Sequence, residues 1–120
     1  MDLYEISTHM KEMTTHQLRV VQIMYDGGNK WQTRAKVAKA LGKRRLTPYD
    51  INCLEMLADK EIIEKGTQDT TAPGSDFAYV YHMTDQIAVL IQQWAEMREQ
   101  QLRAAFVPEP QRPPVKLAVE

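Results

Sequence analysis

Apolar residues three or four positions apart mark five stretches of the chain as amphipathic helices. These stretches cover residues 3–13, 15–25, 33–41, 47–59 and 84–105. The last stretch is the longest, and its apolar residues keep an approximate heptad spacing from Ile87 to Leu102. The pattern therefore predicts a mainly helical protein that ends in one helix of unusual length for a small domain.

Local signals at the helix ends support this division. Thr15, Thr33 and Thr47 each stand where a side-chain oxygen can cap the first turn of a helix. Pro48 follows Thr47 at the first helical position, where its missing N–H costs nothing. The glycines of segment 26–29 and Gly42 stop the second and third helices, because glycine tolerates the positive φ that closes a helix.

Two short segments between the fourth and fifth helices have strand character. Residues 61–65 form a brief run around two isoleucines, and residues 77–82 alternate aromatic with other side chains. Residues 66–75 between them are rich in turn formers. We therefore expect a β-hairpin, besides a short extended stretch around Trp31. We interpret Phe77, Tyr79 and Tyr81 as the packed face of a strand rather than as a platform for stacking bases.

The chain has 120 residues, which suits one domain of the α+β class, mainly α with a small β-hairpin. We assign residues 1–106 to this domain and residues 107–120 to a flexible tail, because four prolines occur in the tail. The sequence lacks an apolar run of the ~18 residues that a membrane span needs, and its start lacks the pattern of a signal peptide. We expect a cytoplasmic protein that does not bind membranes.

Charge is segregated along the sequence, although the formal net charge is only −1. Seven basic residues and no acidic residue lie between Lys30 and Arg45. The rest of the chain holds eight basic and sixteen acidic residues. Because the cationic segment coincides with the turn between two predicted helices, contact with phosphate groups is favoured over a merely solvated face.

Patterns typical of catalysis or metal binding are missing from the sequence. Cys53 and the three histidines, His9, His16 and His82, do not have the spacing of zinc ligands. The sequence also has no pairing of a nucleophile with a base and no glycine-rich phosphate loop. We therefore expect no enzymatic activity, cofactor or metal. We interpret Cys53 as an inert, partly buried thiol, with a redox sensor as the alternative.

The ordered elements from residue 33 to residue 84 resemble a known motif. The stretch TRAKVAKALG at residues 33–42 is similar to the first helix of a winged helix-turn-helix, and INCLEMLADKEIIEK at residues 51–65 resembles its recognition helix running into the first wing strand. The stretch YVYHMT at residues 79–84 resembles the second wing strand and the start of the next helix. The chain thus resembles bacterial and archaeal regulators of the broad MarR, PadR and ArsR type. The resemblance implies a winged helix-turn-helix with extra N- and C-terminal helices that regulates transcription, and we expect a repressor.

In this geometry the recognition helix enters the major groove of duplex DNA with its N-terminal residues toward the bases. Carried over to this sequence, the residues that face the groove are Thr47, Tyr49, Asp50, Asn52 and Cys53. Asn52 suits a bidentate contact to adenine, and nearby basic side chains suit phosphates. The predicted DNA-binding residues are Lys36, Lys39, Lys43, Arg44, Arg45, Thr47, Tyr49 and Asn52.

Acidic residues leave a second function open. The predicted recognition helix carries Asp50, Glu55 and Asp59, and the hairpin loop carries Asp69 and Asp76. Phosphates repel carboxylates, whereas a basic protein partner would attract them. The alternative function is therefore a winged-helix adaptor that binds another protein.

The long helix at residues 84–105 predicts a homodimer. Its apolar stripe continues well past what a domain of this size can cover. The predicted interface residues are Ile87, Leu90, Ile91, Trp94 and Met97. A two-fold dimer would place two recognition helices ~34 Å apart and would therefore bind a pseudo-palindromic DNA site.

Overall fold

The computed structural model describes residues 1–70, 74 and 77–106, and its elements follow the predicted order. The described elements are α1 (Leu3–Lys11), α2 (Thr15–Asp26), β1 (Gln32–Thr33), α3 (Arg34–Ala40), α4 (Pro48–Asp59), β2 (Glu64–Asp69), β3 (Phe77–His82) and α5 (Asp85–Phe106). The five predicted helices are thus confirmed, whereas the predicted tail at residues 107–120 lies outside the described residues. None of the described helices is both long and apolar enough to cross a membrane.

Reciprocal side-chain caps begin three of the helices. Thr14, not Thr15 as predicted, caps α2, because its hydroxyl accepts from the amide of Gln17 while the Gln17 side chain accepts from the amide of Thr14. Thr47 caps α4 as predicted, with Pro48 at the first helical position. Asp2 caps α1 in the same reciprocal way. Each cap satisfies backbone N–H groups that the first helical turn leaves without partners.

The end of α4 corrects the predicted start of the hairpin. Glu61 has a φ of 63° and closes the helix, with the amide of Ile62 donating to the carbonyl of Leu57 at 3.0 Å. This is the helix-ending turn in which glycine is the usual residue. Residue 61 is therefore part of the helix end, Ile62 and Ile63 are buried in the core, and β2 begins only at Glu64.

The sheet has three antiparallel strands in the order β1-β3-β2. β2 pairs with β3 along its full length, with Gly66 opposite Val80. The stretch beside Trp31 joins the same sheet, because Gln32 and Thr33 of β1 pair with Tyr81 and Val80 of β3. The predicted hairpin is confirmed, and β1 adds a third strand at its base.

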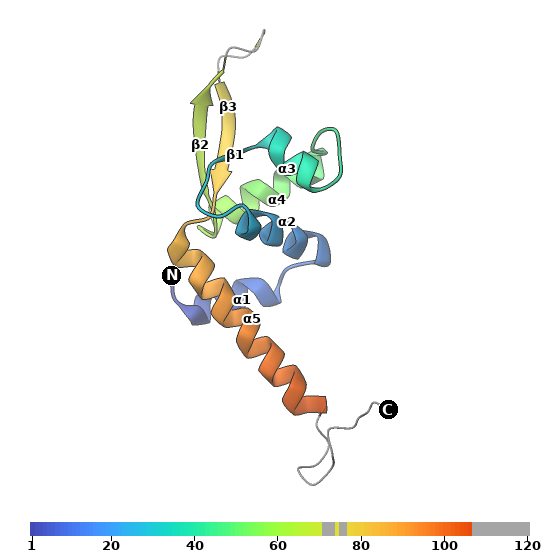
Figure 1. Ribbon diagram of the computed structural model, residues 1–120, viewed down its shortest axis with the longest axis vertical. Helices are drawn as coiled ribbons and strands as arrows, with labels where there is room; N and C mark the ends of the chain where they lie inside the picture. The colour runs from blue at the N-terminus through green and yellow to red at the C-terminus, as the bar shows by residue number, and fades with distance from the viewer. Residues whose placement is uncertain (71–73, 75–76, 107–120) are drawn as a thin grey trace.

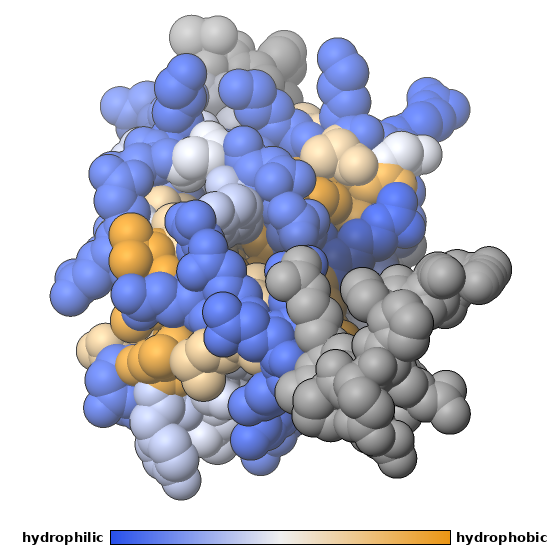
Figure 2. Space-filling view, turned by 60° about the horizontal axis from the view of Figure 1, so that its bottom comes forward, coloured by the Kyte–Doolittle hydropathy of each residue, from blue (hydrophilic) through white to orange (hydrophobic). Residues whose placement is uncertain are grey.

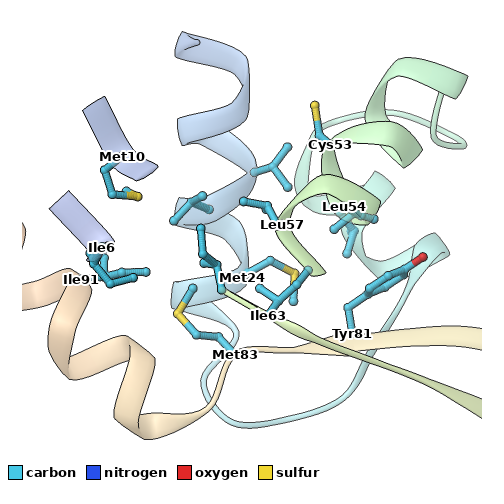
Figure 3. Close-up of a cluster of buried hydrophobic side chains, with 14 of the residues drawn as sticks. Ile6, Met10, Met24, Cys53, Leu54, Leu57, Ile63, Tyr81, Met83 and Ile91 are labelled. Atoms are coloured by element: carbon cyan, nitrogen blue, oxygen red, sulfur yellow. The ribbon is translucent and has the colours of Figure 1, made fainter. Parts of the chain in front are cut away.

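One hydrophobic cluster joins the five helices to the base of the hairpin (Figure 3). Ile6, Leu57 and Tyr81 are completely buried in it, although they come from α1, α4 and β3. In Figure 1, the hairpin projects from one end of the molecule and α5 crosses α1 on its way to the opposite end. The core thereby fixes α3 and α4 between these two projections.

Candidate nucleic-acid interface

A tight turn joins α3 to α4 and carries part of the cationic segment. Gly42 has a φ of 77°, and the amide of Lys43 donates to the carbonyl of Ala38 at 2.8 Å. A positive φ suits glycine because it has no β-carbon. The chain then passes through Arg44 and Arg45 to Thr47, where α4 begins.

The cationic side chains of α3 beyond Arg34, and those of the turn, are exposed. Lys36 and Lys39 lie on α3, and Lys43, Arg44 and Arg45 follow in the turn. Within the described part of the chain, the side chains of four of these five residues make no hydrogen bond or ion pair. The four are Lys36, Lys39, Arg44 and Arg45. They are therefore available to bind anions.

The N-terminal half of α4 exposes the other predicted contacts next to this turn. Tyr49 is 51% exposed, and Thr47 and Asn52 are exposed as well. Tyr49 and Asn52 are three residues apart, so they lie on the same side of the helix. The structure thus brings Thr47, Tyr49 and Asn52 together at the end of α4 that adjoins the cations.

Asp50 does not face outward, which corrects its predicted place in the groove. Only 1% of it is exposed, and its carboxylate lies 2.7 Å from Nζ of Lys43 and 2.7 Å from Nε2 of His16. It also accepts from the amide of Thr47 at 2.9 Å. Burial alone raises the pKa of Asp50, but these hydrogen bonds outweigh it and hold the pKa far below the usual range. The negative charge of Asp50 is therefore balanced by hydrogen bonds within the protein and is not presented to a ligand.

A local signal for this arrangement is present in the sequence. Thr47 and Asp50 are separated by two residues, the spacing of a capping box, in which the acidic residue turns back to the helix start. His16 and Lys43 carry no such signal, because they meet Asp50 from α2 and from the turn.

Cys53 also points inward, in contrast to its predicted place in the groove. It is 2% exposed and belongs to the hydrophobic core (Figure 3). Burial raises the pKa of its thiol, which disfavours the reactive thiolate. Cys53 therefore packs as a small apolar side chain.

Glu55 lies at the centre of a contact between α4 and the hairpin. Its carboxylate lies 2.6 Å from Nζ of Lys65 on β2, accepts from the hydroxyl of Tyr81 on β3 at 2.8 Å, and lies 3.6 Å from Arg34 of α3. Arg34 and Lys65 also lie over the ring of Tyr79, at 4.7 Å and 4.5 Å from its centroid. Burial raises the pKa of Glu55, but the hydrogen bonds from Lys65 and Tyr81 lower it overall. Sequence reasoning missed this cluster because its members come from four separate elements.

Comparison with known proteins supports a fold assignment. No protein-family model and no curated protein matches the chain. It is similar to the solved structure of a possible transcriptional regulator from Methanosarcina mazei Go1, with a TM-score of 0.54 and 18% sequence identity over 85% of this chain and 84% of that one. It is also similar to a single-residue variant of MepR from a multidrug-resistant S. aureus clinical isolate, with a TM-score of 0.55 and 17% identity over 82% of this chain and 67% of that one. The chain has the winged helix-turn-helix fold.

In this winged helix, α3 and α4 form the helix-turn-helix and the β2–β3 hairpin is the wing.

The aromatic residues of the second wing strand are buried to different degrees. Tyr81 at the root is completely buried, Tyr79 is partly buried, and Phe77 toward the tip is 47% exposed. The predicted packed face therefore holds at the root and ends before Phe77. Of the two wing carboxylates singled out in the sequence, Asp69 is exposed and Asp76 lies outside the described residues.

The helix that follows the winged-helix motif, α5, is only partly covered by its own domain. Ile91 is buried in the core, and Ile87, Leu90 and Trp94 pack against it while partly exposed. Farther along, Met97 and Leu102 are 40% and 49% exposed. Two grooves of about 460 and 320 Å³ flank Trp94, and Leu18 of α2 lines both. Figure 2, which turns this end toward the viewer, shows apolar side chains among polar ones.

Proposed function

We propose that the protein is a homodimeric, sequence-specific transcriptional regulator, and that it represses transcription by occupying an operator duplex. The observation that carries this proposal is the joint exposure of the polar residues at the start of α4 and of four cations that have no partner in the described part of the chain. Lys36, Lys39, Arg44 and Arg45 supply the positive charge, and Thr47, Tyr49 and Asn52 lie beside them. A recognition helix meets DNA in this way, with its N-terminal residues at the bases and flanking cations on phosphates.

The distribution of negative charge supports the same surface. Asp50, the acidic residue nearest to the turn, is buried and balanced by Lys43. The other end of α4 carries the exposed Asp59. Asp59 is seven residues beyond Asn52, which places it about 10 Å farther along the helix axis. The N-terminal half of α4 is therefore free of exposed carboxylates that would repel a phosphate.

Different residues would supply affinity and sequence discrimination. Lysine and arginine contacts to phosphate are independent of sequence and supply most of the salt-dependent affinity. Asn52 is suited to the N6 and N7 atoms of adenine, and Tyr49 offers a hydroxyl and a ring face to base edges. We assign base reading to these two residues and positioning on the DNA backbone to the four cations.

Dimerisation would use α5 and its neighbours. Met97 and Leu102 are exposed apolar residues on the part of α5 beyond its core contacts, and the two grooves beside Trp94 are lined by residues of α5 and α2. Exposed apolar surface of this kind is typical of interfaces between proteins. A second copy that covers it would place two α4 helices ~34 Å apart on one face of a duplex.

The protein-binding adaptor is less well supported than the DNA-binding regulator. It rested on carboxylates of α4 and the wing, yet Asp50 is buried and Glu55 is bound to Lys65 and Tyr81. Of the acidic residues of α4 and the wing that were singled out in the sequence and that the structure describes, Asp59 and Asp69 remain exposed. These two carboxylates are half as many as the four exposed cations of the proposed DNA surface, and they lie on different elements.

A double substitution tests the proposed function. Arg44→Ala with Arg45→Ala removes two cations of the turn, whereas the control variant Lys60→Ala removes a partly exposed cation just beyond the other end of α4. Binding to fluorescent duplexes is measured over a range of salt concentrations. The double variant is expected to bind all duplexes more weakly and to lower the slope of log affinity against log salt by about 2. Unchanged affinity in the double variant contradicts the proposal, and the control is expected to match the wild type.

A further inference from the structure

Lys43 differs from the other cations of the turn because it is bound within the protein. Its Nζ atom lies 2.7 Å from Oδ2 of Asp50, and Oδ1 of the same carboxylate lies 2.7 Å from Nε2 of His16. Asp50 is 1% exposed, so its charge is shielded from water. A buried carboxylate is costly unless cations and hydrogen-bond donors surround it. Lys43 and His16 meet this need together with the amide of Thr47.

These three side chains come from three parts of the helix-turn-helix and its support. His16 is in the first turn of α2, Lys43 follows Gly42 in the turn, and Asp50 is in the first turn of α4. Their contacts therefore fix the turn and the start of α4 to α2. We call His16, Lys43 and Asp50 the turn cluster.

The turn cluster also touches a residue of the proposed DNA surface. The ring of His16 lies against the ring of Tyr49, with centroids 5.1 Å apart and planes tilted by 34°. Tyr49 is 51% exposed, so its other surface is open to a ligand. Because His16 is held by Asp50, the position of the Tyr49 ring depends on the cluster.

We infer that Lys43 is a positioning residue for DNA readout and not a phosphate contact, and that the turn cluster acts by holding Tyr49 and the first turn of α4. This inference rests on the proposed function. A phosphate that drew Lys43 away would leave the buried Asp50 carboxylate without its nearest cation, and the loss would offset the new contact. The other four cations of the proposed DNA surface do not pair with a buried carboxylate among the described residues, so a phosphate can bind them without this loss. They are Lys36, Lys39, Arg44 and Arg45.

The experiment compares two lysines that lie four residues apart. Lys43→Gln and the matched variant Lys39→Gln each remove one exposed lysine charge from the cationic segment. Each variant is titrated with the duplex that the wild type selects from a random pool and with an unrelated duplex of equal length. Salt concentration is varied in both series. Thermal unfolding confirms that binding is measured well below the melting temperature.

Lys39→Gln is expected to weaken binding to both duplexes equally. It is also expected to lower the slope of log affinity against log salt by about 1, as loss of a phosphate contact does. Lys43→Gln is expected to lower the affinity for the selected duplex about tenfold, the size of one lost base contact. The salt slope is expected to stay unchanged, and the affinity for the unrelated duplex is expected to change little. Lys43→Arg is expected to restore discrimination, because a guanidinium can also bind the Asp50 carboxylate. A salt slope lowered by about 1 in Lys43→Gln, with both duplexes weakened equally, would overturn the inference.

A second measurement needs no DNA and keeps the test valid if Lys43→Gln does not fold. His16→Ala leaves every cation of the turn in place, and nuclear Overhauser contacts report where the Tyr49 ring lies relative to the other side chains of α4. These contacts are expected to change in His16→Ala, and the variant is expected to lose discrimination at an unchanged salt slope. Unchanged contacts of the Tyr49 ring, or full discrimination in this variant, also overturn the inference. Failure of the wild type to bind any duplex contradicts the proposed function instead, and it is distinguishable because the Tyr49 contacts are read without DNA.

Discussion

The hydroxyl of Tyr81 donates a 2.8 Å hydrogen bond to the carboxylate of Glu55, which joins the second wing strand to the middle of α4. Nε of Arg34 donates to the same hydroxyl at 3.2 Å, so α3 takes part in the contact. Lys65 completes it from the first wing strand at 2.6 Å from Glu55. The angle between the wing and α4 is thus set by polar contacts as well as by the core.

The first prediction concerns this contact. Tyr81→Phe removes the hydroxyl while keeping the ring, and it is expected to lower the free energy of unfolding by about 1 kcal/mol, the usual net value of such a hydrogen bond. Urea unfolding measures the change. Tyr79→Phe is the matched control on the same strand, because its hydroxyl has no hydrogen bond among the described residues, and a change under about 0.5 kcal/mol is expected. Equal effects of the two substitutions would show that the Tyr81 hydroxyl adds nothing.

The second prediction concerns pH. The pKa of Asp50 is lower in the folded protein than in the unfolded chain, so its stabilising effect is present above about pH 4 and is lost as pH falls toward the folded-state pKa. Asp50→Asn removes the charge and is expected to cost about 2 kcal/mol at pH 7, because Lys43 and His16 lose the carboxylate that they bind.

The measurement is the melting temperature of both proteins from pH 7 to pH 3. The wild type is expected to lose stability more steeply than Asp50→Asn below about pH 4, so that the two curves converge. Parallel curves over this range would mean that Asp50 has an ordinary pKa in the folded protein.

The third prediction concerns backbone strain at two of the left-handed helix ends. Glu61 has a φ of 63°, a region that disfavours residues with a β-carbon. Glu61→Gly is expected to raise the free energy of unfolding by about 1 kcal/mol. Gly42→Ala tests the opposite direction, because Gly42 has a φ of 77° and open space where a β-carbon would lie. It is expected to lower the free energy of unfolding by about 1 kcal/mol, and changes of the same sign in both variants would contradict this account.

Features that depend on neighbouring residues were predictable from the sequence. Helix periodicity and caps are local, so the five helices were predicted, and Thr33 and Thr47 cap α3 and α4 as expected. The cap of α2 was misplaced by one residue because Thr14 and Thr15 are adjacent and either can accept from the first turn. The end of α4 at Asp59 was predicted, but the strand that follows was placed three residues too early, because glutamate is an uncommon residue at the positive φ of a helix-ending turn.

Features that depend on distant residues were not predictable in this way. The sequence shows that Asp50 is acidic, but its burial follows from His16, which lies 34 residues away. The same limit applies to Glu55, whose partner Tyr81 is 26 residues away. Both carboxylates therefore looked like obstacles to DNA binding, whereas in the fold they are bound to cations or hydroxyls of the protein itself. The exposure of Tyr49 and Asn52 was easier to predict, because the apolar stripe of α4 fixes which side of the helix is buried.

The measurement that most directly tests the central claim is the selection of duplexes from a random DNA pool by the purified full chain at near-physiological salt, followed by sequencing. The account predicts enrichment of an inverted repeat whose half-site centres lie about one helical turn, ~34 Å, apart. It also predicts that affinity for this duplex falls steeply as salt rises. Binding that is absent, or that appears only at low salt with no enriched sequence, would contradict the assignment of this surface to sequence-specific DNA recognition.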